Sequence, residues 1–292
     1  MKIVQGDELE WVRGLEYRGG TFHYRNLMEG TPGTIDNFQL SMGRNDKDFV
    51  SPRHRHNFEQ FRFQLEGDLN FDRDGKMTPG MLGYFPEGAS YGPQTSEATA
   101  MTIVLQFGGP SGSGYLSRNE VNAGMAELRK FGTFEAGVYK RNPDAPGKRN
   151  MDGFQAIWEH VHGRPLQFPK PRYAQPIMMN QAHYEWVASS EHPGVHEKLL
   201  GVFTERRAEA RLLRLGPGSN LNGKGRGIYF AWSGGGRVNG QPLRALTTVF
   251  LDRGETATFA ADKETEILYF GLPDLRGLSM AKPSLTHAVA AE

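Results

Sequence analysis

Two histidines separated by one residue form the part of this sequence best suited to do chemistry. His54 and His56 stand in the stretch SPRHRHNFEQFRFQLEG, which runs from Ser51 to Gly67. Side chains alternate between faces along a β-strand, so both imidazoles would point the same way. Two neighbouring imidazoles can hold one metal ion. We therefore place the candidate site in this stretch.

The same stretch continues with a second alternating run. A period of two would place Gln60, Arg62 and Gln64 on one face of a strand and the intervening apolar residues on the other. If that polar face lines a barrel, the buried guanidinium of Arg62 needs an anion, and a substrate carboxylate, enolate or phosphate could provide it. A register slip that turns Arg62 to solvent is an alternative.

A structural salt bridge is the remaining explanation for Arg62. The acidic side chains near enough in sequence to form it are Glu59, Glu66, Asp68 and Glu87.

The composition narrows the kinds of partner. Thirty-four Lys and Arg against thirty-three Asp and Glu leave a formal net charge of +1, without the basic patches that bind nucleic acid or anionic membranes. The absence of cysteine excludes disulfides and thiolate sites, and it leaves His, carboxylate, amide and Tyr as metal ligands. We expect a small-molecule substrate or ligand, with no nucleic acid and no membrane as partner.

The ends and hydropathy of the sequence suggest a location. The first residues, MKIVQGDELEWVRG, lack the apolar core of a secretory signal, and no run of about 18 apolar residues occurs. A cytoplasmic protein is expected.

Short strands dominate the expected secondary structure. Thirty-seven glycines, 17 prolines and 11% aromatic residues suit many strands joined by tight turns. Helices are expected only between the halves, at 119–132 and 154–160. The second half repeats the first, since residues 61–67 align with 228–234 and later strands correspond as well. The sequence therefore predicts two copies of one β unit.

These residues resemble the motifs of the cupin superfamily. Its first motif has a glycine, an H-x-H pair, a glutamate and a glycine, and His54, His56 and Gly67 match it. Its second motif has P-x-G followed by a histidine, and Pro86 and Gly88 match it. The resemblance implies an all-β fold with two cupin jelly-roll (double-stranded β-helix) barrels joined by a partly helical connection, a bicupin.

The repeat and the motifs together suggest a division of the chain. We expect an N-terminal barrel with the site at 1–112, a connecting segment at 113–177, a C-terminal barrel at 178–278 and a tail at 279–292. Jelly-roll sheets often pair across subunits, so a homodimer is expected.

Three positions depart from the cupin motifs. Asp48 replaces the first glycine, Gln60 replaces the acidic ligand and Tyr91 replaces the last histidine. Glu59 stands one residue early, and alternation would turn it away from Gln60. By resemblance, His54, His56, Gln60 and Tyr91 would surround one divalent transition metal (Fe, Ni, Cu, Mn or Zn). A phenol must lose its proton to bind a metal, so affinity would be reduced and pH-dependent.

The second copy lacks these ligands. The residues at the four ligand positions are Leu221, Gly223, Gly227 and Ala257. No metal is expected in the C-terminal barrel.

Three functions fit this pattern. The first is a cupin enzyme acting on a small, anionic organic molecule in the N-terminal barrel, for example a metal-dependent dioxygenase, with Arg62 and Gln64 binding the substrate. The second is a metal-free isomerase, epimerase or lyase in which His56 and Tyr91 are acid and base. The third is a non-catalytic small-molecule-binding module, because a polar barrel can hold a ligand by hydrogen bonds alone.

Overall fold

The chain forms two compact units in a computed structural model that describes residues 1–14, 17–18 and 20–278. The N-terminal unit consists mainly of Trp11–Tyr24 and Glu29–Met178, and the C-terminal unit mainly of Met179–Arg276 with Met1–Glu10. The tail expected at 279–292 lies outside the described residues.

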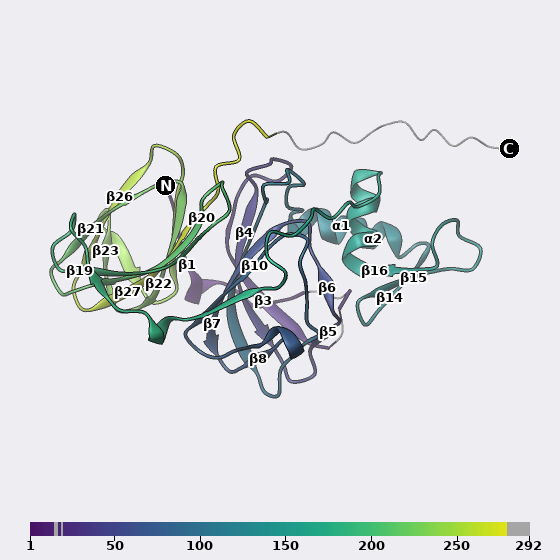
Figure 1. Cartoon of the computed structure of the whole chain (residues 1–292), viewed down its shortest axis with the longest axis horizontal. Helices are drawn as coiled ribbons and strands as arrows, with labels where there is room; N and C mark the ends of the chain where they lie inside the picture. Colours follow the sequence, from purple (N-terminus) through teal and green to yellow (C-terminus); the bar gives the residue numbers. More distant parts are fainter. Residues whose placement is uncertain (15–16, 19, 279–292) are drawn as a thin grey trace. The chain divides into compact units, whose positions relative to one another are not determined.

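A seven-stranded sheet forms one side of the N-terminal unit (Figure 1). Its strands lie in the order β17 (Ile177–Asn180), β10 (Met81–Phe85), β7 (Glu59–Glu66), β13 (Ala100–Phe107), β4 (Phe38–Asn45), β3 (Phe22–Glu29) and β2 (Val12–Arg13). Where their register is described, neighbouring strands pair antiparallel.

Shorter strands form the other side of this unit. One sheet has the order β5 (Val50–Ser51), β12 (Gln94–Thr95), β8 (Leu69–Asn70) and β9 (Lys76–Met77), and a separate pair joins β11 (Ser90–Tyr91) to β6 (His54–Arg55). Side chains of β7 donate hydrogen bonds to β11 and β12. The two sides therefore enclose a jelly-roll interior.

Strand β7 explains the unusual character of this interior. Arg62 lies opposite Val104, and Gln60 lies opposite Gln106, both on β13. The alternate residues Phe61 and Phe63 are fully buried on the other face. The apolar face of β7 therefore points out of the barrel, and its polar face points in.

A glycine ends strand β7. Gly67 has φ +63°, and an added Cβ would lie 2.5 Å from the Thr99 carbonyl oxygen. Only glycine fits this turn without moving the backbone.

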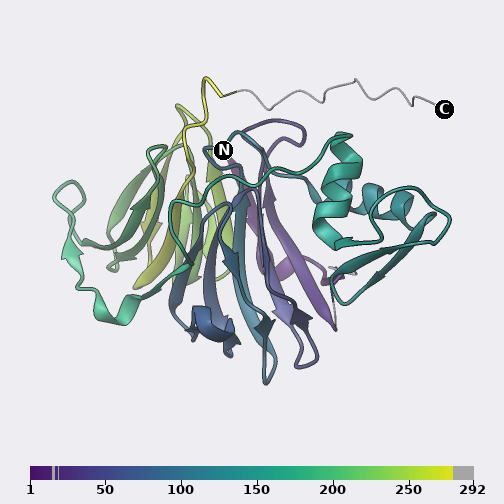
Figure 2. The same cartoon turned by 45° about the vertical axis from the view of Figure 1, so that its right-hand side comes forward.

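Two helices and a small sheet form the connecting segment. Helix α1 (Arg118–Leu128) begins with a capping box between Ser117 and Glu120, and α2 (Gly153–His162) begins at the N-cap Asp152. The helices bury one apolar cluster with β14 (Gly132–Glu135), β15 (Val138–Arg141) and β16 (Asn150–Asp152) beside them (Figure 2). The two helices expected from the sequence are confirmed with different bounds. Helix α1 begins one residue earlier than expected and ends four residues before Gly132, and α2 extends beyond 154–160 at both ends.

Two sheets form the described part of the C-terminal unit. The larger has the order β1 (Lys2–Gln5), β25 (Thr247–Leu251), β22 (Gly227–Ser233), β27 (Thr265–Gly271), β20 (Ala208–Leu215), β19 (Val195–Phe203) and β18 (Val187–Ala188). The smaller has the order β21 (Asn220–Lys224), β26 (Thr256–Ala261), β23 (Gly235–Val238) and β24 (Gln241–Arg244). Three single-turn 3-10 helices complete the described chain, at Gly6–Glu8, Asp72–Asp74 and Gln181–His183.

The first strand differs from the expected division of the chain. We expected residues 1–112 to form one barrel, yet β1 pairs with β25, with Lys2 opposite Phe250 and Gln5 opposite Thr247. A strand joins the sheet that offers it a free edge, and here that edge lies in the C-terminal unit.

The expected fold class is confirmed. The chain is mostly β, with two jelly-roll barrels and a partly helical connection. Among the described residues, no helix is long and apolar enough to cross a membrane.

Candidate functional site

Two short strands bring the two predicted motifs together. Strand β6 pairs antiparallel with β11, and His54 lies directly opposite Tyr91. The Gly88 N–H also donates to the His56 carbonyl at 2.7 Å. Gly88 has φ +79°, and an added Cβ would lie 2.1 Å from the Pro169 carbonyl oxygen, so glycine is required there. The two motifs thereby become one cluster of side chains.

The rings of this cluster are in contact. The His54 ring centroid lies 4.8 Å from that of His56 and 4.6 Å from that of Tyr91. The His56 ring lies 4.4 Å from Phe58 and 5.4 Å from Phe154. His56 is therefore packed among aromatic side chains.

Arg62 connects the polar face of β7 to this cluster. Its Nε and Nη2 both donate to Gln60 Oε1, at 2.9 and 2.7 Å. Nη2 also donates to the Tyr91 hydroxyl at 2.9 Å, and Nη1 donates to Gln94 Oε1 at 2.8 Å. These four bonds use four of the five guanidinium hydrogens, which leaves one on Nη1.

No carboxylate pairs with Arg62 in the described part of the chain. All its hydrogen-bond partners are neutral, and its Cζ lies 4.4 Å from the centre of the Phe85 ring. The acidic candidates from the sequence are engaged elsewhere, for example Glu87 with Arg172 and Asp68 with Lys76. The structural salt bridge considered from the sequence is therefore not formed, and Arg62, 7% exposed, is not turned to solvent.

Burial and positive charge keep the histidines neutral. Burial lowers the pKa of His54 well below its usual range, and the nearby Arg18 guanidinium lowers it further. The pKa of His56 is lowered well below its usual range by the same two causes, with Arg62 as a third. Burial raises the pKa of Tyr91, although Arg62 opposes this shift. The cluster thus holds two neutral imidazoles, a neutral phenol and a guanidinium cation.

This donor set does not fit a divalent metal. The oxygens of Gln60 and Tyr91 already accept hydrogen bonds from Arg62. A cation held by those oxygens would lie close to the guanidinium, and each unit of its charge would cost about 4 kcal/mol at about 4 Å. Among residues 1–14, 17–18 and 20–278, no group of three or more His, Cys, Asp or Glu side chains could hold a metal. The four expected ligands do come together, but two of them, Gln60 and Tyr91, are bonded to the guanidinium of Arg62, and the two histidine rings lie against each other and Tyr91.

Gln64 also faces the interior, but its amide is occupied. Its Nε2 donates to the Glu66 and Gly67 carbonyls, and its Oε1 accepts from the Thr102 hydroxyl. These bonds hold the end of β7. A substrate-binding role for Gln64 stays a prediction that this geometry does not favour.

A small cavity lies beside Arg62 in the N-terminal barrel. It has a volume of about 80 Å³. Its lining consists of Phe22, Ser41, Gly43, Asn45, Phe49, Arg62, Leu69, Gln94, Thr102, Val104, Gln106 and Arg118. That lining has two arginines, several amides and hydroxyls and an apolar wall, and it contains no carboxylate. Neither His54, His56 nor Tyr91 lines it.

Apart from Arg62, sequence reasoning missed the polar residues of this cavity, among them Asn45 and Arg118. Asn45 is 4% exposed, and its Nδ2 has no hydrogen-bond partner in the described chain. The alternation of polar and apolar residues along β4 could have indicated it. Arg118 is the first residue of α1, outside the barrel strands, and no local pattern shows that its side chain reaches the cavity.

Glu59 lies on the opposite face of β7 from Gln60, as alternation predicts. It is buried, and it accepts a hydrogen bond from the Tyr84 hydroxyl. Burial raises the pKa of Glu59 to about 8, and the negative charge of Glu87 adds to this shift. Glu59 is therefore a neutral acid at pH 7 and does not belong to the histidine cluster.

The C-terminal barrel has different groups at the corresponding positions. Leu221 and Ala257 belong to its apolar core, and Gly223 pairs with Ala257. A hollow of about 500 Å³ lies in this unit. The arginine that lines it, Arg211, forms ion pairs with Glu209 and with Glu197, the latter at 2.7 Å.

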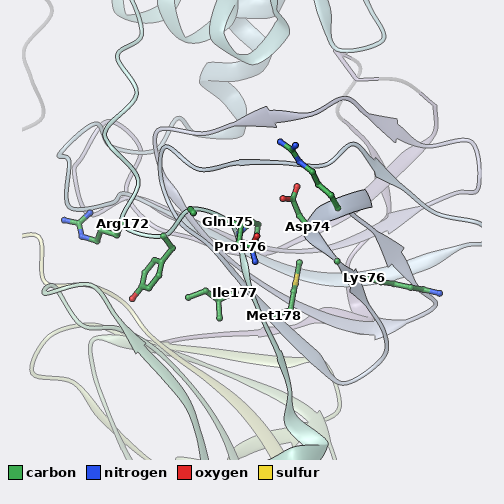
Figure 3. A pocket seen from close by; sticks show the side chains of 11 residues that line it. Asp74, Lys76, Arg172, Gln175, Pro176, Ile177 and Met178 are labelled. Carbon is green, nitrogen blue, oxygen red and sulfur yellow. The ribbon is translucent and has the colours of Figure 1, made fainter.

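A wider hollow lies elsewhere on the N-terminal unit (Figure 3). It has a volume of about 790 Å³, but Lys76 and Arg172 lie at its opposite ends and point away from each other. The Asp74 carboxylate is bonded to Arg53 and to the Gly92 N–H, so it serves the loop structure. This hollow therefore has no convergent set of groups.

Comparisons with known proteins rest on structure. No protein-family model and no curated protein matches the sequence. A crystal structure described as a "putative dioxygenase" from Nostoc punctiforme is similar to this chain, with a TM-score of 0.63 and 12% identity over 99% of this chain and 87% of that chain.

Oxalate decarboxylase from Bacillus subtilis is also similar. Its structure at pH 4.6 has a TM-score of 0.55 and 13% identity over 94% of this chain and 76% of that chain. A structure from work on the Mn(II) centres of the same enzyme has a TM-score of 0.53 at 14% identity over 94% of this chain and 78% of that chain. At these identities the likeness shows the fold alone, which is a mostly β chain with two jelly-roll barrels.

Proposed function

We propose that the N-terminal barrel binds a small organic anion without a metal ion. The observation that carries this proposal is Arg62, a buried guanidinium with only neutral partners among the described residues. An anion in the adjacent cavity would supply the missing negative charge.

The energetics favour an anion at this position. A buried ion costs several kcal/mol unless an opposite charge compensates it. The four hydrogen bonds and the Phe85 ring offset part of this cost for Arg62. A carboxylate on the remaining Nη1 hydrogen would form a charge-assisted bond, about twice as strong as a neutral one.

The cavity is suited to binding rather than to proton transfer. Apart from the two arginines, none of its lining residues is titratable. A general acid or base must come within hydrogen-bond reach of the reacting atom. Of the functions considered from the sequence, the small-molecule-binding module therefore agrees best with the geometry.

A metal-free isomerase, epimerase or lyase is the second candidate. It is favoured by the contact of the neutral His54 ring with Tyr91, whose hydroxyl accepts a hydrogen bond from Arg62. This function requires that the substrate reach Tyr91, which does not line the cavity. Names such as dioxygenase and oxalate decarboxylase describe the similar structures, and the donor set here gives no support for metal chemistry.

Calorimetry with small carboxylates tests the proposal. Acetate, malonate and succinate are titrated into protein treated with a chelator, and at least one should bind with one site per chain. The Arg62→Gln variant, which removes the charge, should lower that affinity about 100-fold, the upper range of a charged hydrogen bond. Arg73→Gln removes an exposed positive charge and should bind as wild type does. Unchanged binding in Arg62→Gln, or no binding of any carboxylate, contradicts the proposal.

A further inference from the structure

The cavity beside Arg62 receives a second cation from outside the barrel strands. Arg118 is the first residue of α1, directly after the N-cap Ser117. The Ser117 hydroxyl accepts from the Glu120 N–H, and the Glu120 carboxylate accepts from the Ser117 N–H and hydroxyl. This capping box fixes the start of the helix, and with it the backbone of Arg118.

Arg118 has no opposite charge in the part of the chain that the structure describes. Its Cζ lies 4.6 Å from the centre of the Tyr24 ring, while its Nε is buried without a hydrogen-bond partner. The Glu120 carboxylate, the nearest acid in sequence, is occupied at the helix cap. Arg118 therefore resembles Arg62 in lacking an anion.

The two arginines face one cavity that contains no carboxylate. Two like charges on one cavity repel each other, and an anion there would interact with both. A third unsatisfied group, Asn45 Nδ2, is a donor from a side chain that is 4% exposed and lines the same cavity. Each of these three groups has a hydrogen-bond donor without an acceptor, and no side chain that lines the cavity carries a negative charge.

The size of the cavity limits the ligand. Water occupies about 30 Å³ per molecule in the liquid, so about 80 Å³ corresponds to two or three waters. Drug-sized ligands need about 300 Å³ or more. Leu69, Phe49 and Val104 add an apolar wall suited to a short carbon chain.

We propose that the ligand is a short organic dianion, with one acidic group at Arg62 and the other at Arg118. This inference rests on the proposed function, because it assumes that the N-terminal barrel binds an anion at Arg62. A dicarboxylate with three or four carbons has the required charge and size. Arg118 is then a specificity-determining residue that selects two acidic groups over one.

Malonate and its monoamide, malonamate, test the second charge at nearly constant size. Wild-type protein should bind malonate at least tenfold more tightly than malonamate in calorimetry. Arg118→Gln should bring malonate to within about threefold of malonamate and leave malonamate affinity unchanged. Arg118→Lys should retain part of the preference, and circular dichroism confirms that each variant is folded. Arg73→Gln is the matched control and should keep the wild-type preference.

The outcomes separate this inference from the proposed function. If Arg118→Gln keeps the full preference for malonate while Arg62→Gln abolishes binding of both compounds, the dianion inference is overturned and the proposed function stands. Equal affinity of wild type for malonate and malonamate likewise overturns the dianion inference and leaves the proposed function standing. If neither compound binds to wild type and acetate and succinate also fail, the proposed function fails, and the inference fails with it.

Discussion

The two barrels differ in the partners of one arginine side chain. In the N-terminal barrel, Arg62 is buried and bonded only to neutral oxygens among the described residues. In the C-terminal barrel, Arg211 forms ion pairs with both Glu209 and Glu197. A cation that already has two carboxylates needs no ligand, whereas a buried cation without one does. The same fold therefore holds a buried arginine without a carboxylate partner, the proposed anion site, in one unit and an arginine paired with two carboxylates in the other.

The interiors differ in the same direction. Between the sheets of the N-terminal barrel lie hydrogen-bonding side chains, among them Gln60, Arg62 and Gln94. The C-terminal core is made of apolar residues such as Leu215, Ile267 and Phe259. An apolar core stabilises its unit by packing, while a polar interior is retained where it binds something.

The largest expected effect concerns Glu59, a buried acid of the N-terminal barrel. Its pKa rises from 4.5 to about 8 on folding, so below pH 4.5 both states are protonated. Between these values only the unfolded state ionises, and the free energy of unfolding falls by about 1.4 kcal/mol per pH unit. Glu59→Gln removes this loss. The variant should match wild type near pH 4 and be about 5 kcal/mol more stable near pH 9, as measured by urea unfolding.

Glu209 of the C-terminal barrel provides a control for Glu59, because loss of its charge should destabilise the protein and not stabilise it. Glu209→Gln leaves Arg211 with one carboxylate instead of two and should destabilise the protein by about 1 kcal/mol. A stability difference between Glu59→Gln and wild type that does not change with pH would contradict a buried neutral Glu59.

A smaller effect is expected at His56. Its ring packs against Phe58 and Phe154, so His56→Ala should lower the free energy of unfolding by about 2 kcal/mol through lost packing. Malonate affinity should change by less than about twofold, because His56 does not line the cavity. A tenfold loss of malonate affinity would instead support the role as metal ligand or acid–base group that the sequence suggested for His56.

Removal of Arg211 should have an effect confined to stability. Arg211→Gln breaks two partly exposed ion pairs and should cost about 1 kcal/mol in urea unfolding. Calorimetry should give the wild-type affinity for malonate. Loss of malonate binding in this variant would indicate that the anion site lies in the C-terminal barrel, and it would contradict the proposal.

The smallest effect is expected from pH. The cavity lining contains arginines but no group that titrates near neutrality, and arginine stays charged. Malonate affinity should therefore vary less than about threefold between about pH 7 and pH 9. A bell-shaped or steep profile would instead indicate that a histidine or Tyr91 contacts the ligand.

Local patterns in the sequence predicted much of this architecture. Alternation along β7 correctly separated Gln60 and Arg62 from Phe61 and Phe63, because the strand has a period of two whatever its partners are. The paired motifs correctly indicated that the histidines and Tyr91 meet. The homodimer and the cytoplasmic location stay predictions.

Local sequence patterns could not predict which distant segments of the chain come together. The pairing of residues 2–5 with 247–250 depends on which sheet edge is free, and local propensity does not encode it. Arg118 reaches the cavity from a helix, and Arg62 finds its partners on two other strands. The metal expectation arose from residue types, their spacing and a family resemblance. None of these shows that the Arg62 guanidinium is bonded to Gln60 and Tyr91, two of the four expected ligands.

Metal dependence of anion binding tests the central claim most directly. Malonate affinity is measured by calorimetry on protein stripped with EDTA and on the same protein after incubation with Mn²⁺, Ni²⁺ or Zn²⁺. We expect the same affinity in all samples, and its loss in Arg62→Gln with or without metal, because the guanidinium is the cation of this site. Binding that disappears after stripping and returns with a metal would contradict the account.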